Sequence, residues 1–184
     1  MPTPVEILSH EHRIIEKVLR AIEGICGKLE RGEAVPPDVL SQVIAFIRDF
    51  ADGCHHRKEE QMLFPALEEH GVPREGGPIG VMLYEHEVGR HLVAQISRAV
   101  EAYTAGDRAA GQEIIPPARR YIELLTQHIF KEDNVLFPMA EQVLDSSAQA
   151  SLAQAFERME EDKGLRTHAH YEEVASQLEA AWTR

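Results

Sequence analysis

The segment His55-His56-Arg57-Lys58-Glu59-Glu60-Gln61-Met62-Leu63-Phe64-Pro65 occurs twice in this chain and organises it. Its second copy is His128-Ile129-Phe130-Lys131-Glu132-Asp133-Asn134-Val135-Leu136-Phe137-Pro138. Both copies read H-x-x-x-E-x-x-x-L-F-P, and a lysine precedes the glutamate in each. Side chains four residues apart lie on the same face of a helix. Each copy therefore predicts a helix that presents a histidine and a glutamate together.

A shorter motif precedes each copy at a matched distance. Glu11-His12 and Glu85-His86 share the same dipeptide. The number of residues between His12 and His55 is 42, and the number between His86 and His128 is 41. A repeat that keeps both its motif and its distance from a second motif is hard to obtain by chance. The sequence therefore predicts two equivalent halves.

Apolar residues recur at helical spacing along the chain, and no segment alternates convincingly as a strand does. The sequence predicts an all-α protein, an antiparallel up-and-down four-helix bundle of about residues 5–140. One or two accessory helices are expected over about 147–184, broken at Gly164. No linker is long enough to divide residues 1–184, so a single domain is expected. The first helix is predicted from Pro4 to Glu30.

Prolines predict where two of these helices change. Pro116-Pro117 predicts a short lead-in from Asp107, with the main fourth helix starting at Pro117. Pro65 and Pro138 are expected to kink or end their helices. The inward stripe of the fourth helix is predicted to be Tyr121, Leu125, His128, Glu132, Val135 and Met139.

Composition excludes several classes of function. The 184 residues include 31 Asp and Glu against 19 Lys and Arg, a net charge of −12, so a nucleic-acid partner is not expected. There is no apolar run of membrane-spanning length, and secretion is not expected. Only two cysteines occur, Cys26 and Cys54, which favours a cytoplasmic location. The ten histidines exceed the roughly four expected from average usage.

The repeat offers an explanation for the excess of histidines. Two halves placed back to back would gather four histidines and two glutamates around one interior volume. Imidazole with carboxylate suits iron, manganese or zinc, whereas calcium and magnesium prefer oxygen ligands. Carboxylates can also bridge two metals between the helices of a bundle. Without a metal, burying these groups would cost several kcal/mol.

In the first copy it is ambiguous which histidine and which glutamate face the interior, because His55 and His56 are adjacent, as are Glu59 and Glu60. Only His55 and Glu59 stand at the same distance from Leu-Phe-Pro as the pair in the second copy. We therefore select His55 and Glu59, and keep His56 as a candidate additional ligand.

The pattern resembles the hemerythrin-like HHE cation-binding domain over roughly residues 5–140. Glu11-His12, His55-x-x-x-Glu59, Glu85-His86 with Gly89-Arg90, and His128-x-x-x-Glu132 carry the resemblance, together with both Leu-Phe-Pro segments. It implies a four-helix bundle around an oxo- or hydroxo-bridged pair of iron ions, for which zinc or manganese could substitute. The implied metal ligands, with both glutamates as bridges, are His12, His55, Glu59, His86, His128 and Glu132.

One position departs from the oxygen-carrying hemerythrins, which have a further histidine four residues after the one matching His86. Here that residue is Arg90, which cannot ligate a cation. The departure speaks against reversible oxygen carriage, or leaves a coordination position to water, His56 or another group. Tyr121 lies on the face of His128, either as a hydrogen-bond donor or as a core residue. Surface positions are expected for His10, His91, His168 and His170.

The resemblance implies a non-haem di-iron protein that binds or responds to O2, NO or peroxide, in sensing, iron homeostasis or defence against oxidative or nitrosative stress. No nucleophile arrangement, phosphate-binding glycine loop or CxxC motif suggests an enzyme. A di-iron oxidase or ferroxidase is the first alternative, but the Glu-x-x-His spacing of ferritin-like enzymes is absent from the repeat. A structural metal-binding module, such as a zinc module, is the second.

Overall fold

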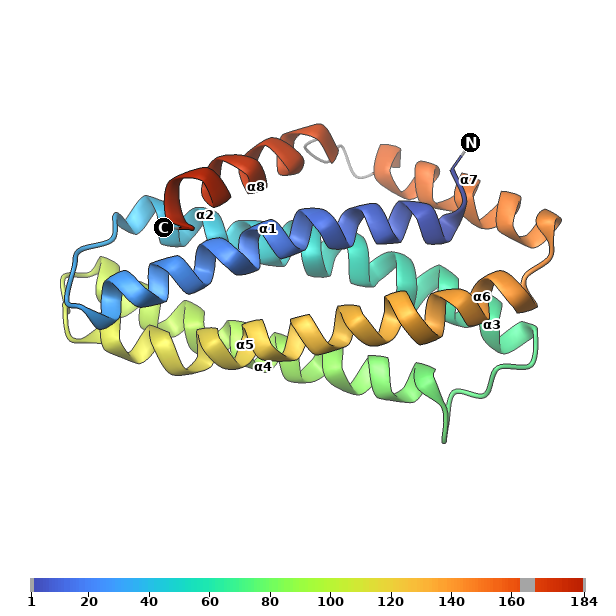
Figure 1. Ribbon diagram of the computed structural model, residues 1–184, viewed down its shortest axis with the longest axis horizontal. Coiled ribbons are helices and arrows are strands. Elements are labelled where there is room, and N and C mark those ends of the chain that lie inside the picture. Colours follow the sequence, from blue (N-terminus) through green and yellow to red (C-terminus); the bar gives the residue numbers. More distant parts are fainter. Residues whose placement is uncertain (1, 163–167, 184) are drawn as a thin grey trace.

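Every secondary-structure element in the computed structural model, which describes residues 2–162 and 168–183, is a helix (Figure 1). The all-α prediction is confirmed. Helix α1 spans Pro4–Glu30, the range expected from the sequence. At its start the Thr3 hydroxyl accepts from the Glu6 amide, and the Glu6 carboxylate accepts from the Thr3 amide. This reciprocal pair is a capping box, which fixes where the helix begins.

The second long rod changes its helical type along its length. It consists of α2 (Pro37–Phe46), two π-helical segments, η1 (Ile47–His56) and η2 (Glu59–Leu63), and α3 (Phe64–Glu69). In a π-helix each amide donates to the carbonyl five residues back, which widens the turn. Such turns are rare and cluster at functional sites. Both π segments lie in or next to the first copy of the repeated motif.

The other two rods are α4 and the series that begins with α5. Helix α4 spans Pro78–Thr104 and is followed by Gly106, whose φ of 105° ends the helical path. The fourth rod consists of α5 (Ala110–Lys131), the π-helical η3 (Glu132–Leu136) and α6 (Phe137–Val143). The segment η3 occupies the same place in its motif as η2 does in the first copy.

Of the two outcomes expected at Pro65 and Pro138, a kink or an end of the helix, the structure does not show an end. The rods continue past Pro65 and Pro138 to Glu69 and Val143. In each rod the amide just before the proline donates five residues back, from Phe64 to Glu59 and from Phe137 to Glu132. Each proline lies in the first turn of the α-helix that follows, where its missing amide costs little.

Two further expectations about the fourth rod are wrong. Helix α5 begins at Ala110 and runs through Pro116 and Pro117 without a break, because neighbouring buried side chains hold the segment against the core. Val135 is 51% exposed, and Leu136 is buried in its place. The π turns of η3 add a residue to the turn, so the inward face moves by one position beyond Glu132.

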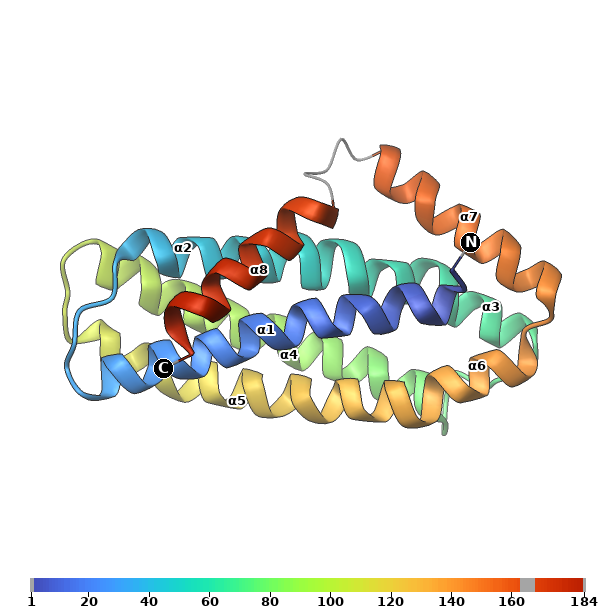
Figure 2. The same ribbon diagram turned by 45° about the horizontal axis from the view of Figure 1, so that its top comes forward.

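The four rods lie side by side along the long axis, and successive rods run in opposite directions (Figures 1 and 2). Two more helices, α7 (Ser146–Asp162) and α8 (His168–Trp182), lie outside them and contact α1. They fall in the range expected for accessory helices, whereas the predicted break at Gly164 lies outside the described residues. Within the described chain, no helix has the length and apolar character needed to cross a membrane.

The core consists of two apolar clusters. One includes Ile15, Leu92 and Leu125, and the other includes Leu8 and Leu136. His12 in α1, His86 in α4 and Glu132 in the fourth rod each fall between the residues of one cluster and those of the other. The fold therefore places a polar layer across the middle of an otherwise apolar interior.

Candidate metal centre

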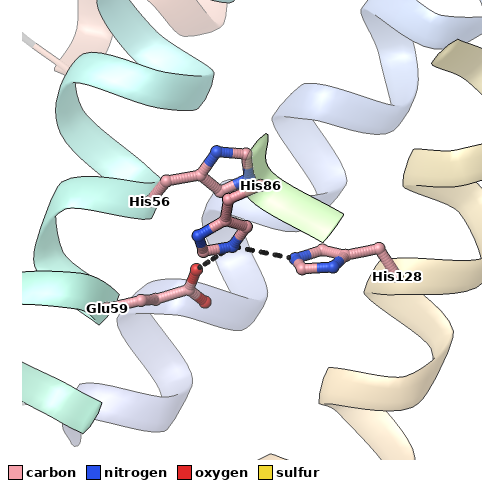
Figure 3. Close-up of side chains that lie close together, drawn as sticks. All are labelled: His56, Glu59, His86 and His128. Carbon is pink, nitrogen blue, oxygen red and sulfur yellow. Dashed lines mark hydrogen bonds and ion pairs between the residues drawn. The ribbon is translucent and has the colours of Figure 1, made fainter. Parts of the chain in front are cut away.

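All six predicted ligands meet in this polar layer. Each is at most 2% exposed. Their ligating atoms form two groups, each within 4.8 Å, and Glu59 belongs to both groups. We name them after their histidines: the His12 group contains His12, His55, Glu59 and Glu132, and the His86 group contains His56, Glu59, His86 and His128 (Figure 3).

Both glutamates reach from one group to the other. The two Glu59 oxygens lie 3.4 Å from His55 Nε2 and 3.3 Å from His86 Nε2. The two Glu132 oxygens lie 3.0 Å from His12 Nε2 and 3.2 Å from His128 Nε2. Each carboxylate therefore lies between two histidines of different groups, as a bridging ligand would.

Several polar atoms of the layer have no hydrogen-bond partner. These buried atoms are Glu59 Oε1 and Oε2, Glu132 Oε1 and His56 Nε2. An unpaired buried polar atom costs about 1–3 kcal/mol, and more when it is charged, so proteins rarely leave four together. Imidazole nitrogens and carboxylate oxygens are the donors that iron, manganese and zinc prefer. The residues present fit a metal pair.

A carboxylate stands behind each of the four repeat histidines. The Nδ1 atoms of His12, His55, His86 and His128 lie 2.7, 2.8, 2.7 and 2.8 Å from carboxylate oxygens, those of Asp133, Glu11, Glu60 and Glu85 respectively. A carboxylate on Nδ1 leaves Nε2 as the nitrogen that faces the centre and fixes the plane of the ring. The outer carboxylates thus orient every histidine toward the same volume.

Each outer carboxylate is itself paired with a cation. Lys58 contacts Glu11, and Lys131 contacts Glu85. Arg13 contacts Asp133, while Arg90 Nη2 lies 2.7 Å from Glu60. These residues account for the invariant parts of the repeat: the glutamate before His12 and His86, the lysine before Glu59 and Glu132, and the acid after them. The sequence-based prediction missed these roles, although the repeat carried the signal.

A sequence model of the hemerythrin HHE cation-binding domain matches residues 3–140, three quarters of the chain. This chain belongs to that family. It is 32% identical over 136 residues to the iron-sulfur cluster repair protein YtfE of Salmonella schwarzengrund, covering 71% of this chain and 59% of that protein. It is 28% identical over 155 residues to the uncharacterized protein Rv1995 of Mycobacterium tuberculosis, and this match covers 84% of this chain and 60% of that protein. This hemerythrin-family chain thus spans about 60% of these curated relatives.

In the polar layer of this hemerythrin-family chain, neighbouring charges shift the pKa values of the buried side chains. Burial alone would lower the pKa of His12, but hydrogen bonds with Asp133 and Glu132 outweigh it and raise that pKa to about 9. Burial also acts to lower the pKa of His128, yet the negative charge of Glu132 raises it to about 10. For Glu132 the opposite holds, because His128 and His12 keep its pKa well below the usual range despite burial. In the metal-free protein, the protonated His12 and His128 therefore pair with the buried carboxylate of Glu132.

His56 joins the layer together with His55, although the two are adjacent in the sequence. It is 5% exposed, its ring stacks on that of His86 with 3.9 Å between centroids, and its Nδ1 lies 3.3 Å from Asp52. Burial and the nearby His86 hold the pKa of His56 well below its usual range, so the ring is neutral. Neighbouring side chains of an α-helix diverge by about 100°, but η1 ends here with wider turns, which bring both rings inward.

Arg90, at the position where the oxygen carriers have a histidine, pairs with the carboxylates that lie behind His56 and His86. Its guanidinium contacts Asp52, Glu60 and Glu87. Beside it a pocket of about 160 Å³ reaches in to the rings of His56 and His86. Tyr121 lines this pocket and is buried there.

Among the histidines expected at the surface, His168 differs from the prediction. It is half-buried, and its Nε2 lies 2.7 Å from Glu11, the carboxylate behind His55. Helix α8 thus contributes to the surroundings of the site. His10 and His91 are exposed, as expected.

Proposed function

We propose that this chain is a non-haem di-iron protein of the hemerythrin type. In this proposal residues 1–184 form one domain, and an antiparallel four-helix bundle of about residues 5–140 holds two iron ions. The observation that carries it is the position of Glu59 and Glu132: each buried carboxylate lies between two histidines, and three of the four oxygens lack a hydrogen bond.

The proposed ligands are the six residues of the repeat. His12 and His55 would hold one ion, His86 and His128 would hold the other, and Glu59 and Glu132, which contact histidines of both groups, would contribute to both. The outer carboxylates keep each Nδ1 protonated, so each Nε2 offers a lone pair. When bound, an iron pair supplies reversible redox chemistry toward O2, NO or peroxide. Zinc or manganese could occupy the same donors.

The biological role proposed is a response to O2, NO or peroxide, in sensing, iron homeostasis or defence against oxidative or nitrosative stress. A relative named as an iron-sulfur cluster repair protein supports iron handling under stress. Because this chain spans only 59% of that protein, its activity extends to this chain as a proposal alone. The presence of only two cysteines, both of them buried, supports a cytoplasmic location.

Metal analysis with an optical spectrum tests the proposal. The protein, loaded anaerobically with Fe(II) and then exposed to air, should hold two irons per chain and show the absorption bands of a bridged ferric pair. Glu132→Gln should lose at least half of the iron, because it removes a bridging charge. Glu141→Gln, an exposed glutamate on the same rod, is the matched control and should keep both ions.

Two results separate the proposal from its alternatives. A single colourless zinc, retained with high affinity and unaffected by O2, would show a structural module instead. Continuous O2 consumption with excess Fe(II) would show an oxidase or ferroxidase, whereas one stoichiometric uptake supports the binding protein proposed here.

A further inference from the structure

The two groups of the centre are unequal in histidines. The His12 group has two, His12 and His55, and the His86 group has three, since His56 joins His86 and His128. The repeat does not explain the third ring, because the residue matching His56 in the second copy is Ile129. An isoleucine fills the corresponding position without any polar atom. The two ring nitrogens of a histidine buried there need partners, either in hydrogen bonds or as metal ligands.

One nitrogen of His56 is used and the other is not. Its Nδ1 lies 3.3 Å from Asp52, and Asp52 in turn lies 2.9 Å from the Arg90 guanidinium. Its Nε2 is buried and has no hydrogen-bond partner. This carboxylate-on-Nδ1 arrangement, with a cation behind the carboxylate, repeats the pattern of the four other histidines. His56 is thus oriented in the same way as the residues proposed to bind metal.

We propose that His56 is a third imidazole ligand of the metal held by His86 and His128, which makes the two metals unequal. This inference rests on the proposed function. It also gives Arg90 and Asp52 a positioning role, because they orient the His56 ring. The His56 ring lines the 160 Å³ pocket and stacks on the ring of His86 (Figure 3), so it would take a coordination position on the pocket side of that metal.

Variants at His56 test this assignment through metal retention and through binding of azide, a small anionic probe. His56→Ala removes the ring, and His56→Gln keeps a polar side chain of similar length that can still bond to Asp52. In both, one of the two irons should be lost to a competing chelator at a concentration at least tenfold lower than in the wild type. The remaining di-iron fraction should bind azide at least tenfold more tightly, since the position facing the pocket is vacated.

Matched controls keep the result specific. His91→Gln changes an exposed histidine on α4 and should leave iron retention and azide affinity unchanged. His55→Ala should weaken the other metal without opening the pocket side to azide. If both His56 variants match the wild type within twofold in both measurements, His56 is not a ligand.

A crystal structure of the iron-loaded wild type decides the point even if the variants fail to fold. His56 Nε2 within about 2.3 Å of iron supports the assignment, by analogy with the metal–imidazole distances of zinc sites. A water molecule between His56 and the iron would overturn it. A wild-type protein that takes up no iron would instead overturn the proposed function, so the two failures are distinguishable.

Discussion

At the scale of single residues, the centre is built in shells of alternating charge. Each repeat histidine lies between the central volume and a carboxylate, and each carboxylate contacts a cation beyond it. Removing an outer carboxylate should therefore weaken metal binding without removing a ligand. Such partners typically contribute 10–100-fold in metal affinity.

Asp133→Asn tests this expectation. The substitution keeps the size of the side chain but removes the charge behind His12, and Arg13 keeps Glu16 but loses Asp133 as a charged partner. We expect iron affinity to fall about 10–100-fold, measured by competition with a chelator. Asp38→Asn, an exposed residue at the start of α2, should leave the affinity unchanged. An unaltered affinity in Asp133→Asn would mean that His12 does not need its outer carboxylate.

The repeat alone was enough to select the six residues that the structure gathers in the polar layer. His56 was left open by the sequence, because a regular helix points neighbouring residues in different directions. The outer cations were missed for another reason. A lysine next to a glutamate on a helix reads as a solvent-exposed pair, and only the packing of α1 and α7 buries Lys58 completely.

At the scale of elements, helical periodicity was sufficient for α1 and for the end of α4 near Gly106. It failed where the backbone left the α-helical spacing. The stripe through Val135 assumed 3.6 residues per turn, and η3 does not keep that value. The predicted interruption at Pro116 and Pro117 treated the loss of their two amides as decisive. Tertiary packing around Ile114 and Ile115 outweighs it.

The contact between α1 and α8 depends on a glycine. A Cβ atom added at Gly24 would collide with the backbone carbonyl of Trp182, near the end of α8. Gly27, one turn further along α1, has room, because its nearest neighbour would be the Arg31 guanidinium at 3.5 Å. The two glycines therefore provide a matched pair of substitutions.

Gly24→Ala should displace the end of α8, whereas Gly27→Ala should stabilise α1 by up to about 1 kcal/mol through helix propensity. Trp182 is the only tryptophan and packs against the core beside Lys28, so its fluorescence reports the docking of α8. We expect a red-shifted emission maximum and stronger quenching by iodide in Gly24→Ala alone. Equal spectra for the two variants would show that α8 tolerates a side chain at Gly24.

At the scale of the whole molecule, metal and protons compete for the same layer. The folded-state pKa values of His12, about 9, and of His128, about 10, exceed the ordinary value of 6.5. Their contribution to the stability of the metal-free protein is therefore complete below pH 6.5. It is lost as the pH rises through about 9 to 10.

Chelated protein should consequently show a Tm that falls between pH 6.5 and pH 10, measured by thermal unfolding. The iron-loaded protein should lack this decline, because its imidazoles are already neutral and held by metal. At metal concentrations about 1,000 times Kd, binding adds about 4 kcal/mol, or roughly 8–16 °C in Tm for a protein of this size. If chelation leaves Tm unchanged at every pH, the layer does not bind metal in the folded protein.

The way each glutamate reaches across the centre has a consequence for biosynthesis. A ribosome that has delivered only the first seventy residues has made His12, His55 and Glu59, but no Glu132 to join them and no Asp133 behind His12. His86 likewise depends on Glu59 and Glu60 from the earlier half. Neither half encodes a complete site for even one ion. If these residues hold the proposed iron pair, metal insertion would therefore follow synthesis of the fourth rod, and a truncated nascent chain would have no finished centre in which to trap iron.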